Sequence, residues 1–547
     1  MNSRMAPSYR LIADTVRAHL RGAIIWTVGG TAAMYVMALA LRSEMSRFEG
    51  GPKALAASVE AGAQAMRLLR WPAERLDTLG GYLTYHNLTL FAYFLSIYAV
   101  VKGVGAIRGA EAAQSLEPIL AAGRPRAGVL RDRAIGFAVV VAAISIGLGA
   151  GLTASMAAGG EPDLGGSFLS ASACGLCAFV AYALGALVSQ SVGTPRSASA
   201  VGALIVTALY LLTNVWDQLG PIGVIRFVSP FYYFNQSRAL VPGHGFSVPA
   251  ALVSMTMATA LLVVAARAFE HRDVGAPLWV WQPRRTPRVT HVQRPALRAY
   301  WSATLVRERP SLLVWFAASA VWMGLMAWLE PSVIDVWDKF DFTRNLTAIN
   351  PRFSPSDHYL SFAAEIIAPI VAAFVITRAA GWVADLEKGR VEIILSGPLS
   401  WPGLVRQRLI ALLVEVAVVV LGAIAGLVIG AIAVGADLYP LGLLRLAAAT
   451  CLLAAGLSAI AALLVAWLRT GAAVTALVVL VGASYLFVLL VEMFGWPDWM
   501  ARVSLFGAFG HPYLTVPPVG GLAFLAVLAV VGTVLAAGVA RRSPKVV

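Results

Sequence analysis

An acidic side chain inside a long apolar stretch is the first feature of this sequence that points to chemistry. Glu415 lies nine positions beyond Arg406, among leucine, valine and alanine residues. Placing a charge within a bilayer costs about 2.5–3.5 kcal/mol, so a carboxylate there marks either a functional site or a structural ion pair. Glu415 is therefore a candidate intramembrane acid. The alternative interpretation is an ion pair with Arg406 or Arg408 at the membrane boundary.

Polar residues near the starts of two other apolar stretches form a second candidate group. His86 and Asn87 occupy nearly the same height in one stretch as Glu365 does in a later one. Together they could line an external vestibule that offers polar groups to amphiphilic molecules. The alternative is that they are simply solvated at the membrane surface.

Two signatures of cofactor chemistry are incomplete in this sequence. The phosphate-binding pattern GxxxxGK[ST] does not occur, and none of the five lysines has a suitable context, so we do not expect the chain to bind ATP by itself. Cys174 and Cys177 have the spacing of a zinc or redox pair, but no second pair or nearby histidine completes a site. With Cys451 they are interpreted as small packing residues. We expect no cofactor in this chain and no enzymatic activity of its own.

Composition places the chain in a membrane. Of its 547 residues, 59% are hydrophobic and 13% charged, and the mean hydropathy is +0.76. Soluble proteins carry about 25% charged residues, and a run of about 20 apolar residues crosses a bilayer. In the ninth such run, Gly422, Gly426 and Gly430 repeat every four residues, which permits close helix approach. The twelve runs expected to span are Gly22–Leu41, Leu83–Ile107, Ala134–Ala157, Phe168–Gln190, Ser197–Leu212, Pro249–Phe269, Leu312–Leu329, Leu360–Ala384, Leu409–Val434, Leu441–Leu468, Ala472–Val491 and Val519–Ala540.

The distribution of arginine orients these spans. Arginine-rich segments follow spans two, six, eight and twelve, whereas the short loop Gly159–Gly166 has two acidic residues and no basic one. The positive-inside rule then predicts a multi-pass protein of the plasma (inner) membrane with both termini cytoplasmic. The rule also accounts for the net charge of +14, so no nucleic-acid partner is expected. Gly22–Leu41 is longer than the apolar core of a signal peptide and is expected to be retained.

Two segments on the external side are long. Arg42–Gly81 mixes charges of both signs with apolar residues, which suggests a short surface helix. Asn214–Ser247 contains the aromatic run Phe231–Phe234, which suits either the headgroup interface or a re-entrant turn.

Internal similarity is the most informative feature of the sequence. Glu117–Arg133 aligns without a gap to Glu392–Arg408, with Glu, Ile-Leu, Gly and two Arg at identical spacing. Upstream, and with a two-residue slip, Tyr82–Tyr85 matches Tyr359–Phe362. Two copies of one charged cytoplasmic loop suggest two docking surfaces for a symmetric partner, with the Ile-Leu pair buried in a groove of that partner.

The repeat predicts an all-α polytopic membrane protein of twelve helices, built as two parallel six-helix repeats. The halves cover residues 1–270 and 296–547, and an arginine- and proline-rich cytoplasmic linker covers 271–295. Each half begins with a basic amphipathic stretch that we expect to lie in the membrane interface. Parallel repeats create a pseudo-two-fold axis along the membrane normal, with a pathway where the halves meet.

The duplicated loops resemble the coupling-helix regions of type-2 ABC exporter permeases. In Glu111–Arg133 and Asp385–Arg408, an acidic stretch, a Glu and a Leu-containing hydrophobic pair precede a Pro/Arg segment that leads into the third span. The resemblance covers essentially the whole chain as a fused double permease, most similar to actinobacterial antibiotic or multidrug efflux permeases of the tetronasin-exporter type. The first copy departs from the usual pattern, since Ala113-Gln-Ser stands where the second has Lys388-Gly-Arg. The halves are therefore expected to couple unequally, or the first only to stabilise docking.

The resemblance implies a partner, a cargo and a set of residues. A separate ABC ATPase, as a homodimer or pseudo-dimer that binds ATP and Mg, would dock on the two loops and drive export of amphiphilic or hydrophobic compounds through the bilayer. Residues implied to lie on or beside the coupling helices are Glu111, Glu117, Leu120, Glu387, Glu392 and Leu395. The second span of each half would line the pathway and the fifth would form its walls. Candidate pathway residues are His86, Asn87, Tyr210, Asn214, Glu365, Tyr485 and Phe487.

An ion-coupled secondary transporter of drugs or lipids is the alternative function. Such proteins place coupling carboxylates at the bilayer midplane in broken helices, whereas ionisable residues here lie mostly near the ends of spans. A membrane enzyme would need acids or metal ligands clustered at one interface, and the seven histidines are scattered.

Overall fold

Helices make up nearly all of the computed structural model, which describes residues 7–47, 71–214, 220–278, 299–339, 352–494 and 496–541. Within these ranges no strand forms, and the one extended pairing is an isolated bridge between Arg238 and Gly245. The chain divides into unit 1, Met1–Arg288, and unit 2, Val289–Val547.

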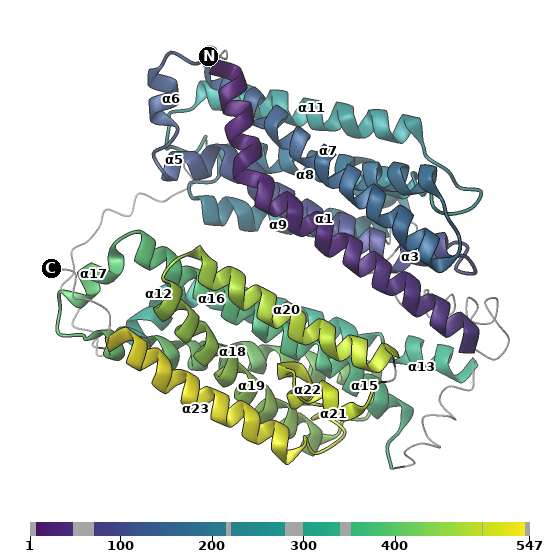
Figure 1. Cartoon of the computed structure of the whole chain (residues 1–547), viewed down its shortest axis with the longest axis vertical. Helices are drawn as coiled ribbons and strands as arrows, with labels where there is room; N and C mark the ends of the chain where they lie inside the picture. Colours follow the sequence, from purple (N-terminus) through teal and green to yellow (C-terminus); the bar gives the residue numbers. More distant parts are fainter. Residues whose placement is uncertain are drawn as a thin grey trace. The chain divides into compact units, whose positions relative to one another are not determined.

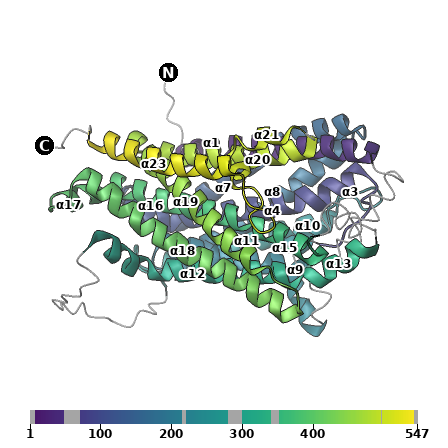
Figure 2. The same cartoon turned by 90° about the horizontal axis from the view of Figure 1, so that it is seen from below.

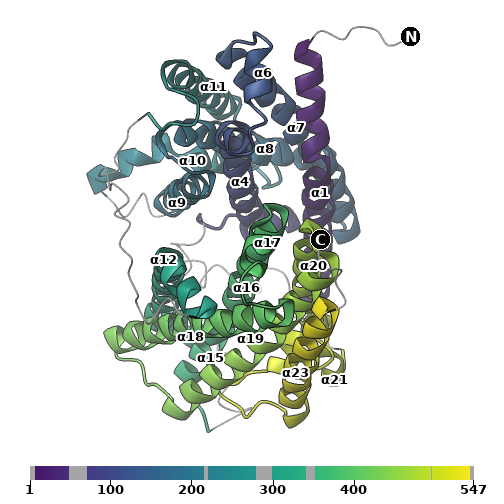
Figure 3. The same cartoon turned by 90° about the vertical axis from the view of Figure 1, so that its left-hand side faces the viewer.

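Unit 1 contains six long helical segments and the short elements that connect them. Its long helix α1 lies along α7 (Figure 1), and α4 packs on α8. Helices α4, α9 and α11 are seen end-on in Figure 3. The elements of unit 1 are α1 (Pro7–Arg47), α3 (Leu79–Leu83), η1 (Thr84–Leu88), α4 (Thr89–Val104), η2 (Gly105–Gly109), α5 (Ala110–Ala112), α6 (Glu117–Ala121), α7 (Arg126–Gly159), α8 (Leu164–Ser191), α9 (Pro195–Asn214), η4 (Gly220–Val228), α10 (Pro230–Asn235) and α11 (Val248–His271).

Unit 2 repeats this order. Its first helix α12 lies along α18, and α19 lies along α23, with the short α17 at the end of the unit where α23 finishes (Figure 2). The elements of unit 2 are α12 (Tyr300–Trp328), α13 (Glu330–Lys339), α15 (Pro355–Glu365), α16 (Ile367–Glu387), α17 (Arg390–Leu395), α18 (Trp401–Val434), α19 (Pro440–Leu468), α20 (Gly471–Phe494), α21 (Asp498–Ala501), α22 (Leu505–Phe509) and α23 (Val519–Arg541).

The twelve apolar runs predicted to span a membrane are confirmed as helices. In the described residues, twelve helical segments are long and apolar enough to cross a bilayer, and each contains one of the predicted runs or coincides with most of it. Helices suit this role because all backbone donors and acceptors are paired within the segment. The all-α fold class is therefore confirmed.

The repeat extends from the loops into the helices that follow them. Helix α18 begins 275 positions after α7 and ends 275 positions after it, and both helices have 34 residues. Each ends at a glycine in the left-handed region, Gly160 with φ 92° and Gly435 with φ 72°. The same displacement separates Glu117 from Glu392, so loop and third helix are duplicated as one block.

Glycines on the third helix of each unit allow close contact with the first. A Cβ at Gly151 would lie 2.0 Å from Oγ1 of Thr31, and one at Gly426 would lie 2.0 Å from the carbonyl oxygen of Ala320. Gly422 and Gly430 likewise face backbone oxygens of α12, within 2.7 Å and 2.2 Å. The close approach predicted from the four-residue glycine spacing is confirmed, and its partner is the first helix of the same unit.

The basic amphipathic stretches do not form separate interfacial helices. Residues 10–21 continue without a break into the first span as the 41-residue helix α1, and the corresponding stretch of unit 2 forms the start of α12 despite Pro310. At 1.5 Å per residue α1 is about 60 Å long, twice the hydrocarbon thickness. Its N-terminal part packs on α7, since a Cβ at Gly136 would lie 2.7 Å from Cβ of Thr15.

Two sequence-based expectations concern segments that are only partly described. The surface helix expected in Arg42–Gly81 would fall largely on residues 48–70, outside the described residues. Most of the linker expected over 271–295 also lies outside them, since residues 279–298 are not described.

The Gly426 contact can be tested by adding a side chain. We expect Gly426→Val to destabilise the protein by about 1–3 kcal/mol, because the added atoms meet backbone that has no rotamer to change. Gly482→Val on α20 is the matched control, since nothing lies within 4 Å of its Cβ position. Thermal unfolding in detergent should show a lower midpoint for Gly426→Val alone, and equal midpoints for the two variants would contradict the contact.

Candidate docking loops and buried charge clusters

Two short helices lie at the arginine-rich ends of the two units and expose an acidic residue each. Helix α6 and the N-terminus of α1 lie at the same end of unit 1, and α17 lies at one end of unit 2 (Figure 1). Glu117 is in the first turn of α6 and Glu392 in the first turn of α17, and both side chains are exposed. Beside Glu392, Ile393 is 74% exposed. An exposed carboxylate beside exposed apolar surface is an arrangement that can dock another protein.

The Ile-Leu pair of the first loop packs partly on its own unit. Ile119 and Leu120 are half-buried against a cluster that includes Leu116 and Phe269 of unit 1. Leu395 of the second loop is half-buried as well. In unit 1 the pair therefore packs the short helix on its own unit, and burial of the rest of its surface by a partner stays a prediction.

Glu111 is not on the surface of its loop. Its side chain is 3% exposed and lies between two guanidinium groups, with Oε2 2.8 Å from Nη1 of Arg108 and Oε1 2.5 Å from Nη2 of Arg272. Arg272 also donates from Nε to Oε1 of Gln190 at 2.7 Å. This buried network joins the ends of the second, fourth and sixth long segments of unit 1. Glu111 therefore acts within unit 1 and offers no carboxylate to a partner in this conformation.

In unit 2 the corresponding loop is held by a different ion pair. Asp385 near the end of α16 lies 3.4 Å from Nη2 of Arg408 and 3.3 Å from Nη1 of Arg390. Gly389 between α16 and α17 adopts φ 65°, a conformation that permits the sharp turn into α17. Glu387 is exposed on the same turn.

Glu415 belongs to a buried cluster with a partner that the sequence did not identify. Its Oε2 lies 2.8 Å from Nε of Arg378, whose Nη1 lies 2.7 Å from Oε2 of Glu308. The alternative pairing of Glu415 with Arg406 or Arg408 is wrong, because α16 places Arg378 against α12 and α18 at this height. The sequence signal for this partner was Arg378 itself, which is the one arginine inside the predicted span Leu360–Ala384.

The second long segment of each unit is irregular where the candidate vestibule residues lie. His86 and Asn87 are in the π-helical turn η1, with His86 stacked on Tyr82 at 4.2 Å between ring centroids. In unit 2 the helix is interrupted between α15 and α16, next to Glu365. Oε1 of Glu365 lies 2.5 Å from Nδ1 of His511, a partner that sequence reasoning missed. Glu365 and His511 remain partly exposed, as a polar vestibule would require, whereas Nε2 of His86 and Oδ1 of Asn87 are buried.

Aromatic residues of α9 and α20, the fifth long helix of each unit, pack on the short helices α10 and α22. The rings of Tyr210 and Phe231 meet edge to face at 5.2 Å, and those of Tyr485 and Phe506 do so at 5.3 Å. Tyr485 and Phe506 stand 275 positions after Tyr210 and Phe231, so the contact is a further part of the repeat. Tyr210 is 4% exposed, whereas Tyr485 is 42% exposed.

The remaining pathway candidates are distributed between core and recess. Asn214 is fully buried at the end of α9, as Tyr210 is on the same helix. Phe487 lines an apolar recess of unit 2 with Ser484 and Phe524. Phe487 therefore lines a space open to an apolar molecule and Tyr485 is exposed, whereas Tyr210 and Asn214 are buried in this conformation.

A comparison with known families concerns the second of these units. Residues 301–541 match the family model described as Multidrug efflux system permease Rv1217c, C-terminal domain. This match supports the interpretation of the chain as a multidrug efflux permease. In a comparison with curated proteins, none matches the chain.

The match covers nearly all of the described part of unit 2. It therefore includes α17, the Arg378 cluster and the Glu365–His511 pair. Together with the twelve apolar helices, it supports a multi-pass membrane permease.

The buried cluster of unit 2 predicts a large effect of removing its cation. Arg378→Met leaves the buried Glu415 without this cation, while Glu308 keeps its contact with the exposed Arg307. Removing one partner of a buried ion pair costs about 3–5 kcal/mol. We expect a lower unfolding midpoint, partly restored by adding Glu415→Gln. Arg390→Met, at a side chain that is 59% exposed, is the control and should change little. An unchanged midpoint for Arg378→Met would show that the cluster does not stabilise unit 2.

Proposed function

We propose that this chain is the membrane-spanning permease of an ATP-binding cassette exporter that moves amphiphilic or hydrophobic drugs out of the cell. The observation that carries the proposal is the pair of exposed short helices, α6 and α17, each attached to the start of its unit's third long helix. In this proposal a separate ATPase dimer binds ATP and Mg and docks on both. The match of residues 301–541 to a multidrug efflux permease model supports the cargo class.

The residues take distinct roles in this mechanism. Glu117 and Glu392, on the exposed faces, contact cationic side chains of the ATPase and set its register. Leu120 and Leu395 hold the short helices on their units, so a push on the short helix reaches α7 or α18 directly. Glu111 holds the neighbouring helix ends of unit 1 through Arg108 and Arg272.

The cargo would meet polar and aromatic groups at the opposite ends of the units. His86, Asn87 and Glu365 supply polar contacts beside irregular turns, where the helix can change conformation at low cost. Tyr485 and Phe487 offer aromatic surface suited to large apolar molecules. Such a mixture binds amphiphiles without strict selection of shape.

An ion-coupled secondary transporter is the second candidate function, and one observation favours it. Glu308 and Glu415 share a single buried cation, Arg378, so the cluster is a place where a proton could bind. Coupling ions of such transporters bind at carboxylates within the membrane. In the ATP-driven mechanism the same cluster is structural.

Charge reversal on the short helices distinguishes these functions. The chain is reconstituted in proteoliposomes with and without its proposed ATPase subunit, and ATP-dependent extrusion of a lipophilic dye is measured. We expect Glu117→Lys and Glu392→Lys each to reduce extrusion about ten-fold or more, because like charges would then meet across the interface.

The matched control is Asp437→Lys, which reverses an exposed acidic residue in the loop between α18 and α19. It should retain full extrusion. Dye movement driven by a proton gradient without any ATPase, and abolished by Glu415→Gln, would overturn the ATP-driven function and establish the alternative.

A further inference from the structure

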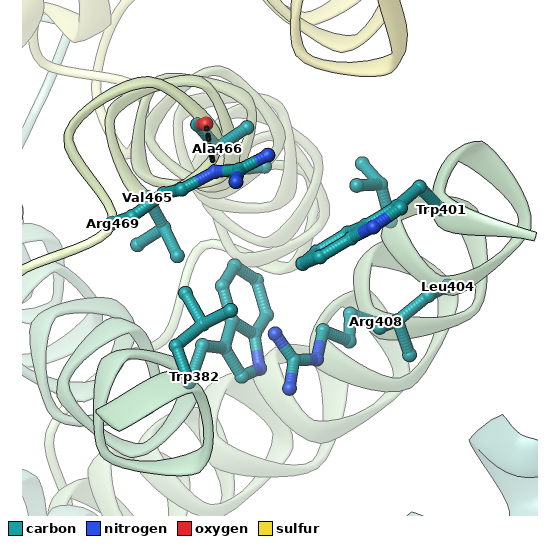
Figure 4. A pocket seen from close by; sticks show the side chains of 10 residues that line it. Trp382, Trp401, Leu404, Arg408, Val465, Ala466 and Arg469 are labelled. Atoms are coloured by element: carbon teal, nitrogen blue, oxygen red, sulfur yellow. Dashed lines mark hydrogen bonds between the residues drawn. The ribbon is translucent and has the colours of Figure 1, made fainter. Parts of the chain in front are cut away.

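A narrow recess opens at the end of unit 2 where α17 lies. It is formed by the last turns of α16, the first turns of α18 and the end of α19, and holds about 380 Å³ of space, including space open to solvent. Two indoles and two guanidinium groups, of Trp382, Trp401, Arg408 and Arg469, face this space (Figure 4). The rest of the lining is apolar. A recess with this lining suits a molecule that is anionic at one end and apolar along its length.

The guanidinium groups of the recess are incompletely paired within the protein. Arg408 is 6% exposed, yet its buried Nε has no hydrogen-bond partner. Its Nη2 is 3.4 Å from Oδ2 of Asp385, and the same carboxylate also forms an ion pair with Arg390. Nε of Arg469 donates only to the carbonyl oxygen of Ala466, at 3.4 Å, and among the described residues no carboxylate lies within 4.0 Å of it. A buried cationic donor without an acceptor is costly, so the recess favours an added anion.

Comparison with unit 1 shows what has changed. At the 275-position displacement of the repeat, the position of Glu111 is occupied in unit 2 by Leu386, which lines the recess. In unit 1 the Glu111 carboxylate neutralises two buried guanidinium groups, Arg108 and Arg272. The same displacement puts Val383 and Val547 at the positions of Arg108 and Arg272, so unit 2 lacks this whole charge cluster. Arg408 stands at the position of Arg133, which in unit 1 donates to the carbonyl oxygen of Ala106.

An exposed tryptophan beside the recess points to the source of that anion. Trp467, two positions before Arg469, is 69% exposed on the outer face of α19, and tryptophan concentrates at the headgroup level of a bilayer. Arg469 and Arg408 lie over the rings of Trp401 and Trp382, at 5.2 Å and 5.8 Å from the ring centroids. Basic pockets between membrane helices on the cytoplasmic side bind anionic headgroups.

We infer that this recess binds an anionic phospholipid, with the headgroup phosphate between Arg408 and Arg469 and the start of an acyl chain along Trp401 and Leu386. A phosphate provides acceptors for Nε of Arg408 and for the unoccupied donors of Arg469. The inference concerns unit 2 alone and does not depend on ATP-driven transport.

Lipid binding to the purified full-length chain tests this inference. Native mass spectrometry measures how many phosphatidylglycerol and phosphatidylcholine molecules remain bound during titration in detergent. We expect preferential retention of phosphatidylglycerol, weakened about five-fold by Arg469→Gln and about five-fold by Arg408→Gln, the effect of one arginine on an anionic lipid. Arg406→Gln is the matched control, since this arginine is exposed on the same helix and does not line the recess.

Three results would overturn the inference. One is equal phosphatidylglycerol binding by all three variants, and another is equal retention of the two lipids by the unmodified chain. The third is full displacement of phosphatidylglycerol by millimolar inorganic phosphate, which would identify an anion site without a lipid. Because Arg408 is buried, its variant is compared by unfolding midpoint first, and Arg469→Gln at the half-buried rim decides the result if Arg408→Gln does not fold.

Discussion

Close contact between the first and third long helices is the constraint on which each unit depends. Hydrophobic burial does not drive helices together inside a bilayer, so association relies on packing at short range. Glycines of α7 and α18 allow this close packing, with Gly151 facing Thr31 and Gly426 facing Ala320. The third helix of each unit begins within a few residues of the exposed short helix. Whatever moves α6 or α17 is therefore joined directly to the most tightly packed helix pair of its unit.

Buried charges fix the remaining helices, and the two units use them in opposite ways. In unit 1 one carboxylate, Glu111, lies between two guanidinium groups. In unit 2 one guanidinium, Arg378, lies between two carboxylates. Ions removed from water contribute little net stability, but an unpaired member would be very costly, so each cluster specifies which helix ends must meet. Duplicated helices are thus arranged by different electrostatics.

The spans, their order and the duplicated loops could be predicted from the sequence, because apolar length and fixed spacing are local signals. Partners across helices could not. Glu415 was recognised as a buried acid, but pairing it with Arg378 requires knowing that α16 packs against α18. An apolar residue on a loop likewise does not reveal which surface covers it, and the sequence did not show that Ile119 and Leu120 pack against Leu116 and Phe269.

One signal was present in the sequence and was missed. Ser229 and Phe231 stand 275 positions before Ser504 and Phe506, the displacement already known from the loops. Both serines cap a short helix, and both phenylalanines pack on a tyrosine of the fifth long helix. Applying the loop displacement to the whole chain would have predicted a second copy of this element in unit 2.

The common displacement also separates scaffold from function. Residues that are shared and buried, such as the glycines of α7 and α18, maintain the fold of either unit. Shared and exposed residues, such as Glu117 and Glu392, suit a partner that meets both units alike. Buried positions at which the two units have different residues are explained neither by the common fold nor by a common partner. A duplicated backbone would tolerate the same residue in both units. The exchange of Glu111 for Leu386, together with that of Arg108 for Val383, is of this kind, and it removes a buried ion pair from this end of unit 2. Differences between the halves are therefore the positions where each unit's own chemistry should be sought.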